Sequence, residues 1–94
     1  MHVISNKRLV EFGALRPEAT VPLKVWRKLV ESRDFAHFAD LKAVFGSVDR
    51  VGKLFVFDIG GNRFRLIAAI HFDRHIVYVR HVFTHAEYDR WSPP

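Results

Sequence analysis

The stretch KLFVFDIGGNRFRLIAAIHFDRHIVYVRHVF, residues 53–83, decides the fold of this 94-residue chain. Apolar side chains recur there at every second position, which is the period of a strand half-buried in a sheet. Gly60-Gly61-Asn62 and Asp73-Arg74 interrupt this alternation, and the glycines suit a sharp turn with positive φ. We therefore predict strands over residues 53–59, 63–72 and 75–83, joined by two turns into an antiparallel sheet.

The N-terminal half has the period of helices instead. A short strand over residues 1–5 is expected to lead into a helix that Ser5 or Asn6 caps and that Arg16-Pro17 ends. A second helix is predicted over residues 20–32, because Pro22 suits a first turn and apolar residues follow at helical spacing. Residues 34–40 are expected to form a short helical turn, and residues 41–45 a loop or a short strand.

The C-terminal segment begins with a helix-capping pattern. Thr84 is followed three residues later by Glu87, the spacing of a capping box, which predicts a final short helix to about residue 91. The whole order predicts one α+β domain over residues 1–94. Its N-terminal helices should pack on one face of the antiparallel sheet.

The composition limits the classes of partner. Fifteen Lys and Arg against ten Asp and Glu give a net charge of +5, which favours a polyanion such as nucleic acid, an anionic membrane or an acidic protein. The absence of cysteine excludes disulfides, thiolate metal sites and cysteine catalysis, and agrees with a reducing cytoplasm. No stretch approaches the roughly 18 apolar residues of a membrane helix, and no signal peptide is visible. We expect a cytoplasmic protein that does not enter a membrane.

Two arginines are the first candidate site residues. If Asp73-Arg74 is a two-residue turn, Arg65 lies opposite Val82 and Arg80 lies opposite Ile67. Alternation then places both arginines on the face that the helices leave open, while His81 and Phe83 fall on the helix-covered face. Two adjacent guanidinium groups suit a phosphate, whose oxygens match their planar fork. The alternative is that each arginine pairs with a carboxylate, such as Asp58 or Glu87, or faces solvent.

The histidines allow two further predictions. His85 and Tyr88 are one helical turn apart and can share a face beside the arginines, where an imidazole can exchange a proton near neutral pH. The structural alternative is an exposed His85 and a Tyr88 that packs on the sheet edge. No metal site and no cofactor are predicted, because the four-residue spacings of His71, His75, His81 and His85 fall around strands and a turn. His71 and His81 are expected to face opposite ways.

Four segments of the chain resemble the HigB-type toxins of the RelE superfamily. They are LKAVF with SVD in residues 41–49, FDIGGNRFR at 57–65, YVRHV at 78–82 and THAEYD at 84–89. The resemblance implies a RelE-like fold and an mRNA interferase that cuts messenger RNA, typically on the translating ribosome, without a metal. The implied chemistry is attack of a ribose 2′-OH on the adjacent phosphate. The implied partner is an antitoxin, usually a helix-turn-helix DNA binder, encoded beside the toxin.

The residues of the chain supply parts for this chemistry, and Arg65 carries over from the GGNxxR motif. Arg65 and Arg80 would stabilise charge on the phosphate, His85 would act as base or acid, and Tyr88 would stack on a base or move a proton. The residues expected to bind RNA are Lys42, Lys53, Asn62 and Arg63. RelE-type enzymes place Lys or Arg where this chain has His85, so the group that takes the 2′-OH proton stays open.

Two other functions stay open beside the endoribonuclease. One is a non-catalytic RNA- or ribosome-binding module, and the other is an interaction domain whose basic face holds an acidic partner. The apolar residues expected on the open face, namely Ile67, Ile76, Tyr78 and Val82, predict that an antitoxin segment covers it.

Overall fold

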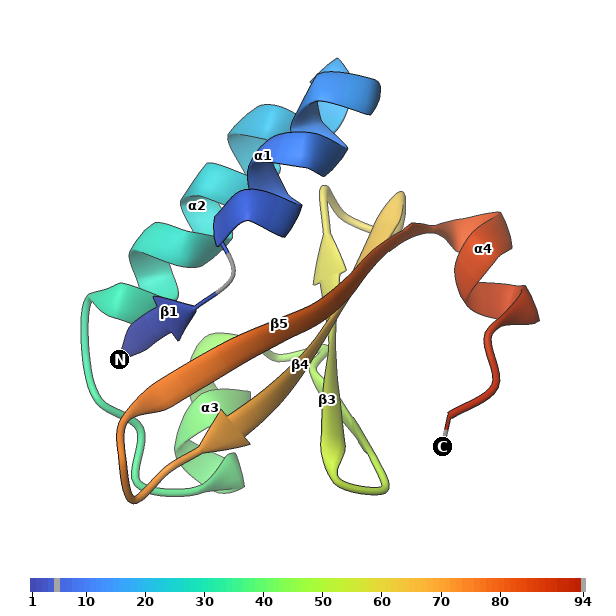
Figure 1. The fold of residues 1–94 in the computed structure, drawn as a ribbon. Helices are drawn as coiled ribbons and strands as arrows, with labels where there is room; N and C mark the ends of the chain where they lie inside the picture. The colour runs from blue at the N-terminus through green and yellow to red at the C-terminus, as the bar shows by residue number, and fades with distance from the viewer. Residues whose placement is uncertain (5, 94) are drawn as a thin grey trace.

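A five-stranded sheet in the order β1-β5-β4-β3-β2 forms the centre of the structure, a computed structural model that describes residues 1–4 and 6–93 (Figure 1). The strands are β1 (His2–Ile4), β2 (Asp49–Val51), β3 (Leu54–Ile59), β4 (Phe64–His71) and β5 (Ile76–Thr84). The helices are α1 (Asn6–Leu15), α2 (Thr20–Glu31), α3 (Phe38–Val44) and α4 (His85–Arg90), with a 3₁₀ turn at Pro17–Ala19. The predicted α+β fold is confirmed. The sheet is mixed, however, because β1 runs parallel to β5.

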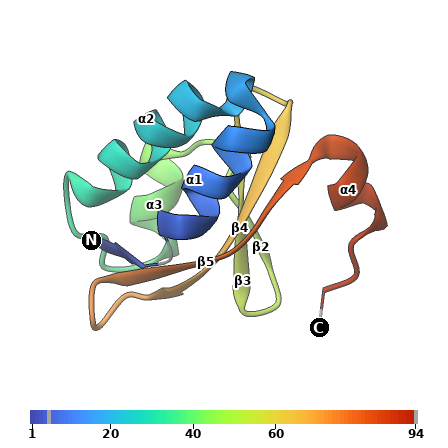
Figure 2. The same cartoon turned by 45° about the horizontal axis from the view of Figure 1, so that its top comes forward.

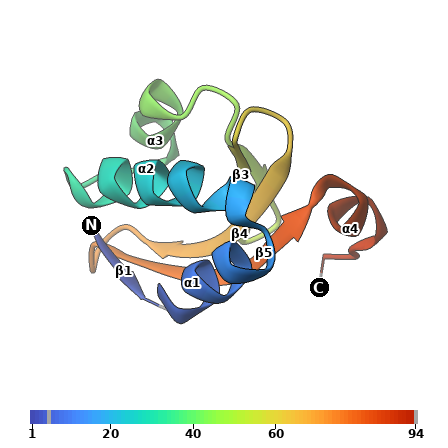
Figure 3. The same cartoon turned by 90° about the horizontal axis from the view of Figure 1, so that it is seen from above.

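The helices α1, α2 and α3 cover one face of this sheet. Phe12 of α1 contacts Phe64 edge-on with 5.5 Å between ring centroids, and Trp26 of α2 contacts Phe57 at 5.4 Å. Phe38 of α3 contacts Phe55 at 5.7 Å on the same face. Figure 2 shows α1 and α2 side by side over the sheet, and Figure 3 shows α4 beyond the end of β5, apart from both. The predicted packing of the N-terminal helices is therefore confirmed.

Two local predictions were wrong in the segment before β3. Residues 41–44 belong to helix α3 and not to a loop or strand, because Phe38 and Leu41 pack inward at helical spacing. This helix has seven residues, which is too short for a clear period in the sequence. Strand β2 was not predicted, because it has only three residues, two of them charged, and lies at the sheet edge.

The ends of the predicted helices are close to those observed. Asn6 is the first residue inside helix α1 and is therefore not its cap, while Ser5, the other predicted cap, lies outside the described residues. Gly60 and Gly61 adopt φ values of 63° and 70°, as the predicted sharp turn between β3 and β4 requires. Within residues 1–4 and 6–93, none of the helices has the length and apolar character needed to span a membrane.

A β-bulge in β5 changes the predicted register. Near the turn the pairs are those expected, with Ala68 opposite Val79. The register then shifts, so that Ile67 lies opposite His81 and Arg65 lies opposite Phe83, with Arg80 as the extra residue. The predicted pairings of Arg65 with Val82 and of Arg80 with Ile67 are therefore wrong.

The bulge also exchanges the faces of the last β5 residues. Val82 packs against the main core under the helices, although it was predicted on the open face. His81 and Phe83 were predicted on the helix-covered face, but they lie opposite Ile67 and Arg65 on the open face. One extra residue reverses the alternation of side chains, which explains all three errors.

Candidate functional site

The open face of the sheet carries a second, smaller apolar layer. Val56 and Ile67 pair across β3 and β4, and they are only 4% and 0% exposed, yet neither belongs to the main core. The C-terminal segment lies over this region: the Trp91 ring contacts Phe83 at 6.0 Å and His81 at 5.8 Å. The prediction that Ile67 is exposed was therefore wrong. The C-terminal segment therefore packs on the face that the helices α1 to α3 leave open.

Arg65 is held at the centre of this face by three neighbours. Its Nε lies 3.1 Å from Oδ1 of Asp58, which is directly opposite on β3, and its Nη2 donates to the side-chain oxygen of Asn62. Its guanidinium lies over the Tyr88 ring, with 5.7 Å between Cζ and the ring centroid. The arginine side chain is 11% exposed. The structural alternative, a pair with Asp58, is thus the arrangement observed for Arg65.

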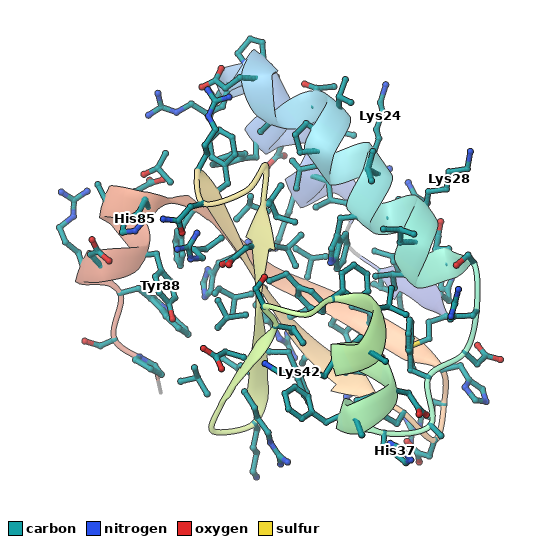
Figure 4. The ribbon with its side chains drawn as sticks, turned by 180° about the vertical axis from the view of Figure 1, so that it is seen from behind. Lys24, Lys28, His37, Lys42, His85 and Tyr88 are labelled. Carbon is teal, nitrogen blue, oxygen red and sulfur yellow. The ribbon has the colours of Figure 1, made fainter. Side chains whose placement is uncertain are left out.

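Helix α4 is anchored by the predicted capping box. The Thr84 backbone N–H donates to Glu87 Oε1 at 2.8 Å, and the Glu87 N–H donates back to Thr84 Oγ1 at 3.2 Å. The first of these bonds lowers the pKa of Glu87 below its usual value, because it stabilises the carboxylate. The cap therefore orients the short helix that carries His85 and Tyr88, and Figure 4 shows Tyr88 on the side of α4 that faces the sheet.

His85 forms a polar pair with Asp89 on the same helix. Its Nδ1 lies 3.1 Å from Oδ2 of Asp89, and both side chains are about half-exposed. Since a carboxylate can only accept, Nδ1 carries the proton and Nε2 is the ring nitrogen able to accept one. A carboxylate that orients an imidazole in this way is suited to proton transfer.

Arg80 lies on the same face as Arg65 but not next to it. Its guanidinium sits over the Tyr78 ring at 5.7 Å, it is exposed, and it joins no ion pair among the residues that the structure describes. It lies three positions from Phe83, which is opposite Arg65, a span of roughly 10 Å along a strand. The two arginines therefore do not converge on one point as the predicted register implied.

His81 is a site residue that the sequence argument missed. It stacks on Phe83 with 4.9 Å between centroids and an interplanar angle of 12°. Burial lowers its pKa below the usual value, and the charges of Arg8 and Arg80 lower it further. The uncharged ring thus forms part of an aromatic surface with Phe83 and Trp91. Only the bulge brings it to this face.

Two carboxylates take part in the site, of which Asp58 was named beforehand only as an alternative partner of the arginines and Asp89 was missed. Asp58 lies opposite Arg65 because a short turn joins β3 to β4, so counting outward from Gly60-Gly61 would have favoured this pairing. Asp89 is four residues from His85, the spacing that brings two side chains together on a helix. Both signals are present in the sequence.

The predicted RNA-binding residues are divided between two regions. Asn62 contacts Arg65, and its neighbour Arg63 is exposed with its guanidinium 5.7 Å from the Phe64 ring. Lys42 lies on α3, where its Nζ donates to the Val48 carbonyl at 3.0 Å, and Lys53 lines a cavity with Arg50 and His37. In Figure 4, β3 lies between Lys42 and α4. The two lysines are thus apart from the Arg65 site.

The donor set for a metal is limited. Among residues 1–4 and 6–93, no three His, Asp or Glu side chains form a group that could hold a metal ion. His71 contacts Tyr78 on the open face, and His81 faces the same way after the bulge, so the prediction that they face opposite ways was wrong.

Comparison with known proteins places this geometry in a family context. Residues 19–91 match the HigB_toxin family model, described as a RelE-like toxic component of a toxin-antitoxin system. The chain is 35% identical over 92 residues to the mRNA interferase toxin HigB of Escherichia coli K12, covering 95% of this chain and 88% of the relative. The mRNA interferase HigB of Shigella flexneri gives the same values. That of Escherichia coli O6:H1 is 31% identical over 93 residues, covering 96% and 90%.

Proposed function

The chain belongs to the HigB family of RelE-like toxins from toxin-antitoxin systems, and on that premise we propose that it is an endoribonuclease that cleaves messenger RNA. The observation that carries the proposal is the grouping of Arg65 and Tyr88 in contact, beside a helix on which Asp89 orients His85. A cation, an aromatic ring and a proton-transfer group on one open face are the parts that RNA cleavage needs.

The proposed reaction is a transesterification within the RNA. The ribose 2′-oxygen forms a bond to the adjacent phosphorus while the bond from phosphorus to the 5′-oxygen breaks. A base removes the 2′-OH proton and an acid protonates the departing 5′-oxygen. The products are a 2′,3′-cyclic phosphate and a free 5′-OH, and the protein's own side chains supply the catalysis without a metal.

Each site residue has a proposed part in this reaction. Arg65 stabilises the charge that builds on the phosphate, since hydrogen bonds to Asn62 hold it in place before substrate arrives. His85 exchanges a proton through Nε2, and Tyr88 positions the substrate or moves the second proton. Arg80 binds a neighbouring phosphate, because the bulge places it too far along β5 to share one with Arg65.

The finer features of the function are also proposals. We expect Asn62, Arg63, Lys42 and Lys53 to bind RNA, with the net charge of +5 favouring the polyanion. Cleavage on the translating ribosome, a location in the cytoplasm and a helix-turn-helix antitoxin follow the family resemblance.

Expression of the chain alone tests the proposal directly. The wild-type chain should stop protein synthesis and produce new messenger RNA fragments with 5′-OH ends. Arg65→Ala and His85→Ala should relieve toxicity while the variants stay folded. Matched controls are Arg50→Ala and His37→Ala, because both residues are exposed, lie near α3, and His37 has its own Asp40 partner at 3.7 Å. Full toxicity of both site variants would refute the assigned site.

A non-catalytic RNA- or ribosome-binding module is the second candidate. The pair with Asp58 favours it, because a carboxylate already neutralises part of the Arg65 charge. This module would block translation and protect RNA from digestion, but the 5′ ends of messenger RNA would not change. Mapping those ends after induction therefore separates the two functions.

A further inference from the structure

The exposed apolar side chains of the described residues gather on α1 and α2. The large hydrophobic residues that are 41% to 80% exposed are Val10, Leu15, Val21, Val25 and Leu29. Val21, Val25 and Leu29 recur at four-residue spacing, so they form one continuous stripe along α2, which we call the α2 stripe. A solvated helix does not need such a stripe, and contiguous exposed apolar surface marks interaction sites.

Apolar grooves border α2 on both sides. The α2 stripe lines one groove of about 370 Å³, whose other walls include Trp26, Phe45 and Ile59. A second groove of about 460 Å³ runs between α1 and α2 and is lined by Leu9, Val10 and Leu23 among others. The stripe thus forms one wall of the first groove, and Lys24 lines the second groove on the other side of α2, a shape that suits a helix laid alongside α2.

The border of this surface is positively charged. Figure 4 shows Lys24 and Lys28 projecting from α2 on the side of the molecule away from α4. Neither lysine pairs with a carboxylate in the described part of the chain, whereas Arg27 is bound to Glu31 at 3.1 Å. Two unpaired lysines one helical turn apart complement carboxylates on a partner.

We propose that the α2 stripe binds an acidic amphipathic helix of the antitoxin. The identity of this partner rests on the proposed function, because a toxin of this family is neutralised by its antitoxin. A second copy of the chain fits poorly, since it would bring Lys24 and Lys28 against the same lysines. RNA fits poorly too, because aliphatic side chains offer no ring on which a base can stack. This surface replaces the open face as the antitoxin site, since Ile67 and Val82 are not exposed there.

Binding of the antitoxin encoded beside the toxin gene, measured by calorimetry with purified proteins, tests the proposal. The double variant Val25→Asp/Leu29→Asp should weaken the complex about tenfold or more, since apolar anchors dominate such interfaces. Lys24→Glu/Lys28→Glu should weaken it as well, with a smaller effect at high salt than at low salt. The matched control is Leu15→Asp, which is 80% exposed and lines neither groove.

The outcomes separate this proposal from the proposed function. The α2 variants should cleave RNA at the wild-type rate when free, because neither Val25 nor Leu29 belongs to the proposed catalytic or RNA-binding residues; Asp58, the partner of Arg65, lines the same groove but is not changed. Wild-type affinity of the double variant, or a complex in which hydrogen exchange of residues 21–29 is not slowed, overturns the proposal. So does a wild-type dimer that Val25→Asp/Leu29→Asp dissociates, which would assign the stripe to a second copy. Failure of the wild-type chain to cleave RNA, with antitoxin binding intact, would instead count against the proposed function.

Discussion

The guanidinium of Arg65 on β4 lies over the ring of Tyr88 on α4, with 5.7 Å between Cζ and the ring centroid. This contact joins the sheet to a helix of six residues that makes few other contacts with it. A cation over an aromatic face contributes about 0.5–2 kcal/mol, depending on its exposure. Under the proposed function, binding of RNA at Arg65 is therefore coupled to the placement of α4 through this pair of side chains.

Substitution of Tyr88 should separate stacking from proton transfer. Tyr88→Phe retains the ring under Arg65, so affinity for an RNA with a 2′-deoxy cleavage site should stay near wild type. Its cleavage rate should fall by about 10²-fold or more if the hydroxyl moves a proton. Tyr88→Leu should lower both affinity and rate. Equal behaviour of the two variants in both assays would contradict this division of roles.

The pair of His85 and Asp89 should act as a unit. Asp89→Asn removes the charge that orients Nδ1, and we expect a rate loss of about tenfold. In the background of His85→Ala the same change should have almost no further effect, since coupled residues are not additive. Single-turnover cleavage of a defined RNA measures all four proteins. Additive losses would show that Asp89 acts independently of His85.

Thr84 should control the order of α4. Thr84→Ala removes the acceptor for the Glu87 N–H and should cost about 1 kcal/mol of local stability. Thr84→Ser retains the hydroxyl and serves as the control. Hydrogen exchange of residues 85–91 should become faster in the alanine variant only, with a parallel fall in RNA cleavage. Unchanged exchange in Thr84→Ala would mean that the Trp91 contacts alone hold the helix.

His81 should make the stability of the fold depend on pH. The folded chain holds the pKa of His81 below the ordinary histidine value of 6.5, so the unfolded chain takes up the proton first as the pH falls. The free energy of unfolding should therefore decrease as the pH falls from 6.5 to the lowered pKa. The stability that the uncharged His81 contributes is fully present above pH 6.5. His81→Phe keeps the stack on Phe83 and removes the titratable group. Between pH 7.5 and pH 5 the melting temperature of the variant should fall less than that of the wild type. An identical fall in both proteins would contradict the role of His81.

The salt dependence of RNA binding should identify the cations that touch phosphate. Each lost contact to single-stranded RNA lowers the slope of log K against log salt by about 0.7. Arg80→Ala should give this change, because Arg80 is exposed without an ion pair among the described residues. Lys53→Ala and Lys42→Ala test the two distant lysines in the same assay. An unchanged slope would show that the substituted lysine does not contact phosphate. For Lys42 it would leave the hydrogen bond to the Val48 carbonyl as the role of the side chain.

The sequence by itself determined the elements that depend on local spacing. The period of two gave β3, β4 and β5, the glycine pair gave the turn between the first two, and Thr84 with Glu87 gave the cap of α4. These features involve residues a few positions apart, whose geometry the backbone fixes. The same kind of spacing also places Asp58 opposite Arg65 and Asp89 beside His85.

The tertiary structure alone decided how the two faces of the sheet are used. The bulge at Arg80 leaves no mark in the alternation, because apolar residues on both sides of it allow either register. Its position depends on Val82 packing under the helices while His81 and Phe83 pack with Trp91. These two packing contacts involve the N-terminal helices on one face and the C-terminal segment on the other, so local spacing within β5 does not determine them. The bulge separates Arg80 from Arg65 along β5 and brings His81 and Phe83 to the open face.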